Sequence, residues 1–313
     1  MTPSTAQMPV FVLCGGLGTR LREETEFRPK PMIPIGEQPI LWHIMRTYAH
    51  HGFRRFILCL GYKAELIMAY FLNYTRMQSD VTVDLKDNSL EVHAVNHSQD
   101  WQVTLAHTGD VAMTGARVAR AAGKYLGDAE HFAVTYGDGL TDANLCDELA
   151  FHASHARIGT VLGVNPPSRF GELKTEGDRV TQFDEKPSLT NHWINGGYFL
   201  FRRSFLRYLS TDDGCVLERG PLIRLAHDGE LCSFKWRGFW ACMDTQRDRE
   251  HLDKMWSSGS APWAVAEEPP QRASVTMNGD AVLRHGSHIA APVDGPSTGS
   301  HITDRTRSTR RGI

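Results

Sequence analysis

The sequence predicts an α/β protein built on a parallel sheet, and three observations carry this prediction. Residues 10–13 form a short apolar run typical of a buried strand, and a glycine-rich turn follows it at once. Apolar side chains recur at helical spacing over 39–50 and again over 64–73. A second buried strand is expected between these helices, over 56–60. This strand–helix–strand–helix order favours parallel strands joined by right-handed crossovers.

The same patterns continue along the chain, with one small hairpin inserted over 81–95. Further strands are expected over 103–106, 131–136, 158–164, 179–183 and 198–201, and further helices over 116–125, 145–155 and 246–256. The composition changes after Trp263, because residues 264–313 are rich in Ser, Thr, Gly, Pro and Arg. Such a segment buries too little surface to offset the entropy of ordering it, so we predict a disordered tail over 264–313.

Composition and charge exclude several classes of function. The chain has 313 residues and a net charge of −2, so no long-range field attracts nucleic acid or an anionic membrane. No run of about 18 apolar residues is present, and residues 1–9 do not resemble a secretory signal. The six cysteines are scattered without a C-x-x-C pair and are interpreted as reduced thiols. We therefore expect a cytoplasmic protein with no membrane or nucleic-acid partner.

The glycine-rich turn, G-G-L-G-T-R over 15–20, is the first candidate site. Glycines allow close approach of the backbone to a ligand, and successive N–H groups in such a turn bind anions. The turn matches neither the Walker loop nor G-x-G-x-x-G, so taken alone it is equally a tight connection between strand and helix. Arg20 adds a fork that suits phosphate, and Lys30 is held between two prolines on a stiff segment. Together these features predict a triphosphate cradle.

Two aspartates are candidate metal ligands. Asp138 lies between two glycines after the predicted strand 131–136, and Asp244 follows an aromatic run. Ligands of open α/β sheets bind beyond the carboxyl ends of the strands, where both residues are expected. Two carboxylates beside a phosphate site are suited to Mg²⁺, with water and phosphate oxygens completing its coordination. Each aspartate taken alone is equally a turn or helix-capping residue, so the hypothesis requires that the two converge.

Three polar segments between apolar strands are candidates for binding a sugar phosphate: Arg-Phe-Gly at 169–171, Glu-Lys-Pro at 185–187 and Asn-Gly-Gly at 195–197. Each one taken singly is more typical of a turn or a salt bridge in a loop. No G-x-S-x-G motif or Cys/His arrangement indicates covalent catalysis.

Taken together, the motifs resemble those of the sugar-1-phosphate nucleotidyltransferases. The resemblance runs in family order from Met8 to Trp263 and leaves out the tail. The motifs that carry it are L-C-G-G-L-G-T-R-L, R-P-K-P-M, T-G-D-x-x-M-T-G-x-R, T-Y-G-D-G, R-F-G, E-K-P, I-N-G-G and F-W-x-x-M-D-T. It implies a Rossmann-like core with a mixed, mostly parallel sheet, flanking helices and the inserted hairpin. It also implies a nucleotide-binding part over about 8–140 and a sugar-phosphate-binding part over about 141–263.

Within the family the motifs are most similar to the cytidylyl branch. That likeness implies transfer of a cytidylyl group from CTP to α-D-glucose 1-phosphate, giving CDP-glucose and pyrophosphate for nucleotide-sugar synthesis. The sugar phosphate would attack the α-phosphate in line, with Mg²⁺ as the cofactor. The resemblance also implies a homo-oligomer, with a hexamer as one form. Two alternatives stay open: a relative that uses another nucleotide or sugar 1-phosphate (thymidylyl, uridylyl or guanylyl transfer, or a heptose phosphate), and a non-catalytic protein that binds sugar nucleotides.

The resemblance also assigns a role to each matched residue. Lys30 and Arg20 would be catalytic, and Asp138 and Asp244 would hold the metal ion. The nucleotide would be bound by Leu13, Gly15, Gly16, Gly18, Thr19, Arg20, Thr114, Arg117 and Gly137. The sugar phosphate would be bound by Gly171, Glu185, Lys186 and Asn195.

Overall fold

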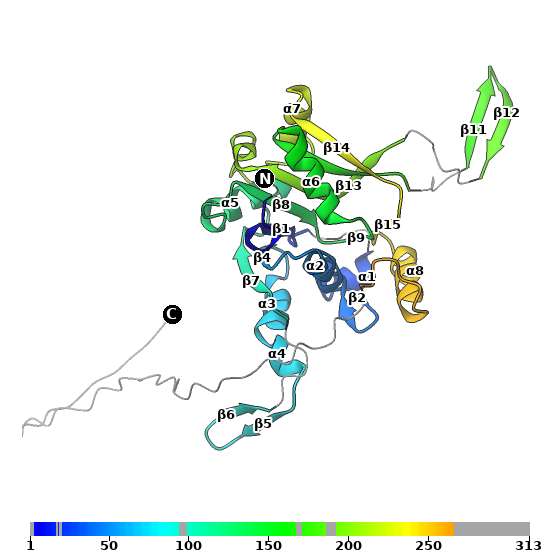
Figure 1. Cartoon of the computed structure of the whole chain (residues 1–313). Helices are drawn as coiled ribbons and strands as arrows, with labels where there is room; N and C mark the ends of the chain where they lie inside the picture. Colours follow the sequence, from blue (N-terminus) through cyan, green and yellow to red (C-terminus); the bar gives the residue numbers. More distant parts are fainter. Residues whose placement is uncertain are drawn as a thin grey trace, which may run out of the picture. The chain divides into compact units, whose positions relative to one another are not determined.

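The structure is a computed structural model that describes residues 3–16, 18, 21–93, 99–166, 171–185 and 192–265, with the backbone alone at 22 and 23. Within these residues, seven strands form the central sheet in the order β14-β10-β13-β8-β1-β4-β7 (Figure 1). Their bounds are Leu231–Trp236, Gly159–Val164, Ile194–Arg202, His131–Tyr136, Pro9–Leu13, Arg55–Leu60 and Gln102–His107. Strand β13 runs antiparallel to both neighbours, and the other neighbouring pairs are parallel. The predicted α/β fold with a mixed, mostly parallel sheet is confirmed.

The sheet is flanked by helices. The α-helices are α1 (Arg22–Thr25), α2 (Ile40–His50), α3 (Ala64–Leu72), α4 (Tyr74–Met77), α5 (Thr114–Tyr125), α6 (Leu145–His155), α7 (Pro221–His227) and α8 (Gln246–Ser257). Short 3-10 helices cover Thr5–Gln7, Lys30–Met32 and Arg203–Tyr208. The predicted strand 131–136 and helix 145–155 are confirmed to the residue.

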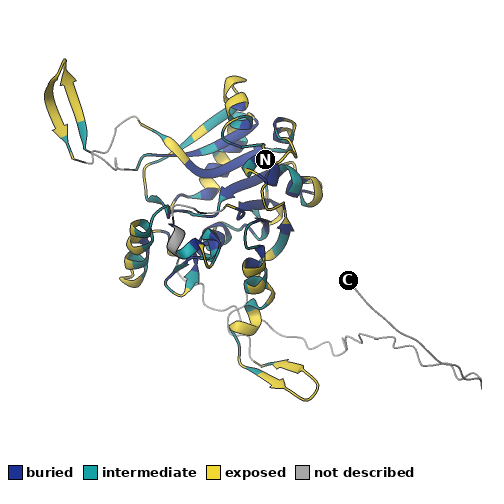
Figure 2. Cartoon of the chain, turned by 180° about the vertical axis from the view of Figure 1, so that it is seen from behind, coloured by how far each residue is buried: buried dark blue, intermediate teal, exposed yellow. Residues whose placement is uncertain are grey.

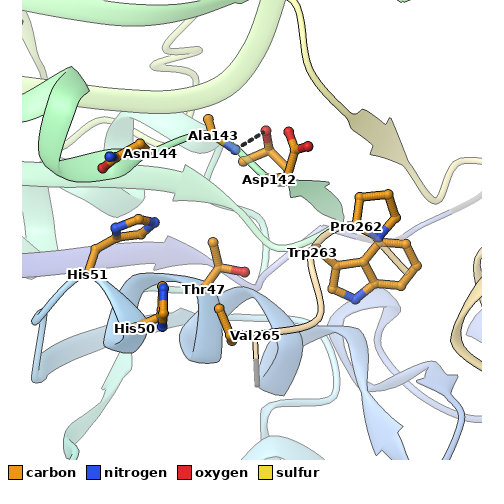
Figure 3. Close-up of a pocket in the computed structure, with 10 residues that line it drawn as sticks. Thr47, His50, His51, Asp142, Ala143, Asn144, Pro262, Trp263 and Val265 are labelled. Carbon is orange, nitrogen blue, oxygen red and sulfur yellow. Dashed lines mark hydrogen bonds between the residues drawn. The ribbon is translucent and has the colours of Figure 1, made fainter. Parts of the chain in front are cut away.

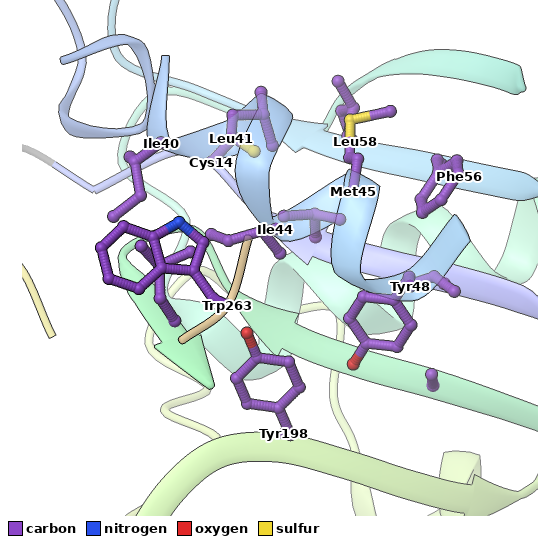
Figure 4. Close-up of a cluster of buried hydrophobic side chains, with 14 of the residues drawn as sticks. Cys14, Ile40, Leu41, Ile44, Met45, Tyr48, Phe56, Leu58, Tyr198 and Trp263 are labelled. Carbon is purple, nitrogen blue, oxygen red and sulfur yellow. The ribbon is translucent and has the colours of Figure 1, made fainter. Parts of the chain in front are cut away.

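Both faces of the sheet are buried, as expected for parallel strands covered by helices. Alternate side chains of β1 point to opposite faces: Val10 and Val12 join Ile44 of α2 in one buried cluster, whereas Phe11 joins Val118 of α5 in another. Figure 4 shows the first cluster, in which α2 lies against the sheet. The helix contributes Ile44, Met45 and Tyr48, and the sheet contributes Phe56 and Tyr198. The two clusters hold the ends of neighbouring strands in fixed positions.

Two hairpins lie outside this core, and Figure 2 shows them exposed along most of their length. Strands β5 (Val81–Asp84) and β6 (Ser89–Val92) form the predicted inserted hairpin as far as residue 92. Strands β11 (Glu172–Glu176) and β12 (Arg179–Asp184) form the second one. Only β12 was predicted, because β11 contains a single large apolar residue, Leu173.

Two shorter ladders connect loops. Strands β2 (Pro34–Ile35) and β3 (Gln38–Pro39) make a tight turn before α2. Strands β9 (Gly139–Thr141) and β15 (Trp240–Cys242) pair although about 100 residues separate them. The second ladder matters for function, because each of its strands is joined to a candidate aspartate.

The predicted tail lies outside the described residues from 266 onward, and the division of 8–263 into nucleotide and sugar parts stays a prediction. Among the helices in the described part of the chain, none is long and apolar enough to cross a membrane.

Candidate active site

The predicted site residues gather at one edge of the sheet. Strands β1 and β8 end side by side at Leu13 and Tyr136, which are paired in the ladder. Strand β13 is antiparallel and therefore begins at this same edge, with Asn195 in its second position. The glycine turn and Gly137 follow the first two strands directly. Ligands of α/β sheets bind at such an edge, so the topology places these segments where a ligand would lie.

The β9–β15 ladder brings the two candidate aspartates together. Asp138 directly precedes β9, and Asp244 follows β15 after one residue. The ladder pairs Gly139 with Cys242, and the Met243 N–H donates to the Asp138 carbonyl at 2.9 Å. The two carboxylates are therefore held at neighbouring positions by backbone hydrogen bonds, and the convergence that the metal hypothesis requires is present.

Lys30 lies between these carboxylates. Its Nζ donates to Oδ2 of Asp138 at 2.6 Å and to Oδ1 of Asp244 at 2.7 Å. The Lys30 side chain is 14% exposed. Burial acts to lower the pKa of Lys30, but the charge of Asp138 and the hydrogen bonds to both carboxylates outweigh it and raise that pKa. Lys30 is therefore positively charged at neutral pH, and its charge offsets that of one carboxylate.

The residues present fit a small divalent cation. Carboxylate oxygens are the protein ligands that Mg²⁺ prefers, and here two of them approach a single point occupied by Nζ. Among the described residues, no three or more His, Cys, Asp or Glu side chains are grouped so that they could hold a metal ion. A cation at this point would therefore take two ligands from the protein and the rest from water and phosphate oxygens.

The glycine turn folds back toward the lysine segment. Gly18 has φ +60, and a Cβ at this position would lie 2.6 Å from Cγ2 of Thr25 and 3.3 Å from Cβ of Lys30. The Gly18 carbonyl accepts hydrogen bonds from the Leu21 N–H and the Thr25 hydroxyl. Only glycine suits this left-handed, crowded position. Leu17, Thr19 and Arg20 lie outside the described residues, so the roles predicted for Thr19 and Arg20 stay predictions.

The Arg117 side chain forms hydrogen bonds at the ends of three neighbouring strands. Its guanidinium is buried and donates to the backbone carbonyls of Gly15 (3.0 Å), Leu60 (2.9 Å) and Gly109 (2.7 Å). It also donates to the Thr108 hydroxyl at 2.9 Å. These acceptors follow or end strands β1, β4 and β7. The structure thus gives Arg117 a clear positioning task beside the glycine turn, whereas its predicted contact with the nucleotide remains a prediction.

Sequence reasoning missed one carboxylate at this edge. Glu218 lies in the loop before α7, and it accepts hydrogen bonds from the hydroxyls of Thr114 and Tyr136. The Tyr136 oxygen also accepts one from Asn195. Tyr136 could have been singled out as the neighbour of G-D-G, but V-L-E-R-G around Glu218 carries no recognisable motif.

The other described sugar-phosphate candidates flank the second hairpin. Gly171 and Glu185 lie at its base, where a Cβ on Gly171 would be 3.1 Å from Oε2 of Glu185. Lys186 lies outside the described residues. The structure therefore brings Gly171 and Glu185 together, and their predicted roles stay predictions.

Two pockets are lined by residues other than the predicted site residues. One, of about 160 Å³, is lined by residues from the end of α2, the start of α6 and the segment around Trp263 (Figure 3). None of the predicted site residues lines it, and typical ligand sites are larger, at about 300–1,000 Å³. The other, of about 300 Å³, opens beside the lysine segment between Phe27, Arg28, Met32 and Leu66. Only the second lies next to the candidate site.

Comparisons with known proteins agree with this arrangement. The model of the family described as "Nucleotidyl transferase" matches residues 10–222. The chain therefore belongs to the nucleotidyl transferase family, and it is an enzyme of that class. Such enzymes generally use a divalent metal.

Particular relatives narrow the comparison. The chain is 45% identical over 260 residues to glucose-1-phosphate cytidylyltransferase of Salmonella typhi, a match that covers 83% of this chain and 100% of that protein. It is 29% identical over 253 residues to the catalytic subunit beta of mannose-1-phosphate guanylyltransferase of Danio rerio, covering 79% and 64%. The solved structure of HddC from Yersinia pseudotuberculosis complexed with GMP-PN has the same fold, with a TM-score of 0.56 and 22% identity over 80% of this chain and 99% of HddC.

Proposed function

We propose that this protein transfers the cytidylyl group of CTP to α-D-glucose 1-phosphate, forming CDP-glucose and pyrophosphate. The observation that carries the proposal is the 45% identity that extends over the full length of the Salmonella typhi glucose-1-phosphate cytidylyltransferase. The pairing of Lys30 with two carboxylates beside a glycine turn supports it, since these groups suit two phosphate-bearing substrates. Guanylyl transfer is less favoured, because the guanylyltransferase relative is only 29% identical.

The reaction requires positioning rather than a general base. A phosphate oxygen of glucose 1-phosphate is already anionic at neutral pH, so it attacks the α-phosphorus of CTP without losing a proton. The new P–O bond forms as the bond between the α-phosphorus and the pyrophosphate oxygen breaks. Charge stabilisation and alignment dominate reactions of this kind. The enzyme has to bring two polyanionic substrates together.

The residues of this chain supply that stabilisation in the proposal. Backbone N–H groups of the glycine turn, with Arg20, hold the triphosphate, and Arg117 fixes the turn through Gly15. Lys30 moves from the aspartates toward the reacting phosphates and offsets their negative charge. Asp138 and Asp244 would hold Mg²⁺, which would supply positive charge to neutralise the phosphates. Gly171, Glu185, Lys186 and Asn195 hold the sugar phosphate.

We also propose a homo-oligomer in the cytoplasm. Both hairpins expose apolar side chains, including Val83 and Leu85 on one and Leu173 and Phe183 on the other. An isolated two-stranded hairpin is only marginally stable in water, so contact with a second copy would stabilise each one. None of the six cysteines, all of which lie among the described residues, forms a disulfide, and this suits a reducing compartment. A light-scattering mass of several chains, such as six, supports the oligomer, and a monomeric mass at micromolar concentration contradicts it.

A pyrophosphate-release assay tests the proposed activity. Each of the four NTPs is supplied with glucose 1-phosphate and then with a panel of other sugar phosphates, in the presence of Mg²⁺. We expect the highest kcat/KM with CTP and glucose 1-phosphate. A higher kcat/KM with another pair contradicts the assigned substrates, and no release with any pair favours a non-catalytic binding protein.

A further inference from the structure

Glu218, which lies outside the predicted motifs, occupies a central position in a network of hydrogen bonds with residues that lie inside them. Its Oε1 accepts a hydrogen bond from the Tyr136 hydroxyl at 2.5 Å, and its Oε2 accepts one from the Thr114 hydroxyl at 2.9 Å. Tyr136 ends β8 two residues before Asp138, and Thr114 begins α5. One carboxylate thus joins a sheet strand and a helix at the edge where the candidate site lies.

The loop that carries Glu218 also caps α5. The Met113 N–H donates to the Asp213 carbonyl, and the N–H groups of Gly115 and Ala116 donate to the Cys215 carbonyl. These donors lie at the helix start, where backbone N–H groups have no partner within the helix. The loop is therefore firmly attached, and Glu218 has a fixed position relative to Tyr136.

The hydrogen bond to Glu218 decides what Tyr136 can offer a ligand. A phenol has one proton, and here that proton is given to the carboxylate. The Tyr136 oxygen accepts one hydrogen bond from Nδ2 of Asn195 at 3.2 Å. Asn195 is itself oriented, because its Oδ1 accepts the Gly197 N–H at 2.8 Å. Toward any further group, Tyr136 is therefore only an acceptor.

An oxygen that can only accept hydrogen bonds selects a ligand group that donates one. Sugar hydroxyls donate, whereas phosphate oxygens that are ionised at neutral pH do not. The phenol proton of Tyr136 is donated to the Glu218 carboxylate, so the phenol oxygen is left to accept a hydrogen bond from the ligand. Asn195, the other partner of Tyr136, is one of the residues already proposed to bind the sugar phosphate.

We propose that Glu218 is a positioning residue for the sugar substrate: it orients the Tyr136 hydroxyl so that the phenol oxygen accepts a hydrogen bond from a sugar hydroxyl. This inference rests on the proposed function. In this proposal Glu218 acts on the sugar through Tyr136. Its other partner, the Thr114 hydroxyl, would stay in place without Glu218, because it also accepts a hydrogen bond from the Leu217 N–H at 2.9 Å. Loss of Glu218 should therefore weaken use of the sugar phosphate and leave use of CTP largely unchanged.

The test compares Glu218→Gln, Tyr136→Phe and the double variant by pyrophosphate release, varying each substrate at saturating concentration of the other. We expect each single variant to raise KM for glucose 1-phosphate about 3- to 10-fold, the range for one hydrogen bond, with kcat and KM for CTP changed less than about 2-fold. The double variant should be no worse than Tyr136→Phe. Asp213→Asn is the matched control, because its carboxylate is on the same loop but pairs with Arg120 at the surface. It should match the unaltered protein.

The following outcomes would overturn the inference. Unchanged KM for glucose 1-phosphate in Glu218→Gln removes the positioning role. Equal increases in both KM values, or a further loss in the double variant, show that Glu218 acts only through the framework around α5. If the unaltered protein does not use CTP and glucose 1-phosphate, both the proposed function and the inference are overturned. If the unaltered protein uses them and only the variants depart from expectation, the inference alone is overturned.

Discussion

The ammonium group of Lys30 bridges Asp138 and Asp244, with Nζ–O distances of 2.6 and 2.7 Å. This bridge joins the stiff proline-flanked segment to both strands of the β9–β15 ladder, at the end where Gly139 pairs with Cys242. A divalent cation can use both carboxylates only when the ammonium moves away. The triphosphate of a nucleotide offers that ammonium a new anionic partner, so we expect metal binding and nucleotide binding to be coupled.

Removing the lysine should free the carboxylates for metal. Without nucleotide, Lys30→Ala should bind Mn²⁺, used as a paramagnetic probe, at least ~10-fold more tightly than the unaltered protein, because a buried positive charge is gone. Electron paramagnetic resonance of free Mn²⁺ measures this directly. Asp138→Asn is the control, since it should weaken Mn²⁺ binding. Equal Mn²⁺ affinity in Lys30→Ala and the unaltered protein would show that the lysine does not compete with metal.

The same substitution should slow the reaction. Lys30→Ala is expected to lower kcat by roughly 10²–10³, the scale for losing one preorganised group that stabilises the transition state. Circular dichroism should show that the variant remains folded, because the lysine lies at the edge of the core. A folded Lys30→Ala protein with nearly normal kcat would remove Lys30 from the catalytic machinery.

The glycine turn provides a matched pair of variants. A Cβ on Gly15 would lie 2.1 Å from Cζ of Arg117, whereas a Cβ on Gly16 would meet nothing within 4 Å. Gly15→Ala should therefore displace the buried guanidinium and destabilise the fold by about 1–3 kcal/mol, as overpacking does. Gly16→Ala should change the free energy of unfolding by less than ~0.5 kcal/mol. Urea unfolding of both variants checks this, and equal stabilities would mean that Arg117 moves at no cost.

A buried carboxyl outside the site should make stability depend on pH. Burial raises the pKa of Glu148 to about 8 from 4.5, and its Oε1 has no hydrogen-bond partner among the described residues. The folded state therefore binds more protons than the unfolded state between these values, and Glu148 favours folding less as pH rises from about 5 to 8. Glu148→Gln should remove this part of the slope. Urea midpoints measured over this range test it, and parallel curves for the two proteins would contradict it.

Local patterns predicted most of the fold and the identity of the main candidate residues. Strands such as 131–136 are strongly apolar, and Lys30 and Asp138 stand out because prolines or glycines flank them. The convergence of Asp138 with Asp244 could not be predicted, because it depends on two three-residue strands that pair across about 100 residues. Glu218 gave no signal at all, since its role depends entirely on partners distant in sequence.

The central claim is that this chain makes CDP-glucose. The most direct measurement supplies the four NTPs together at equal concentration with glucose 1-phosphate and Mg²⁺, and identifies the nucleotide sugar by mass spectrometry. We expect CDP-glucose to be the main product and to be nearly lost with Lys30→Ala. A different nucleotide sugar as the main product, or no nucleotide sugar at all, would contradict it.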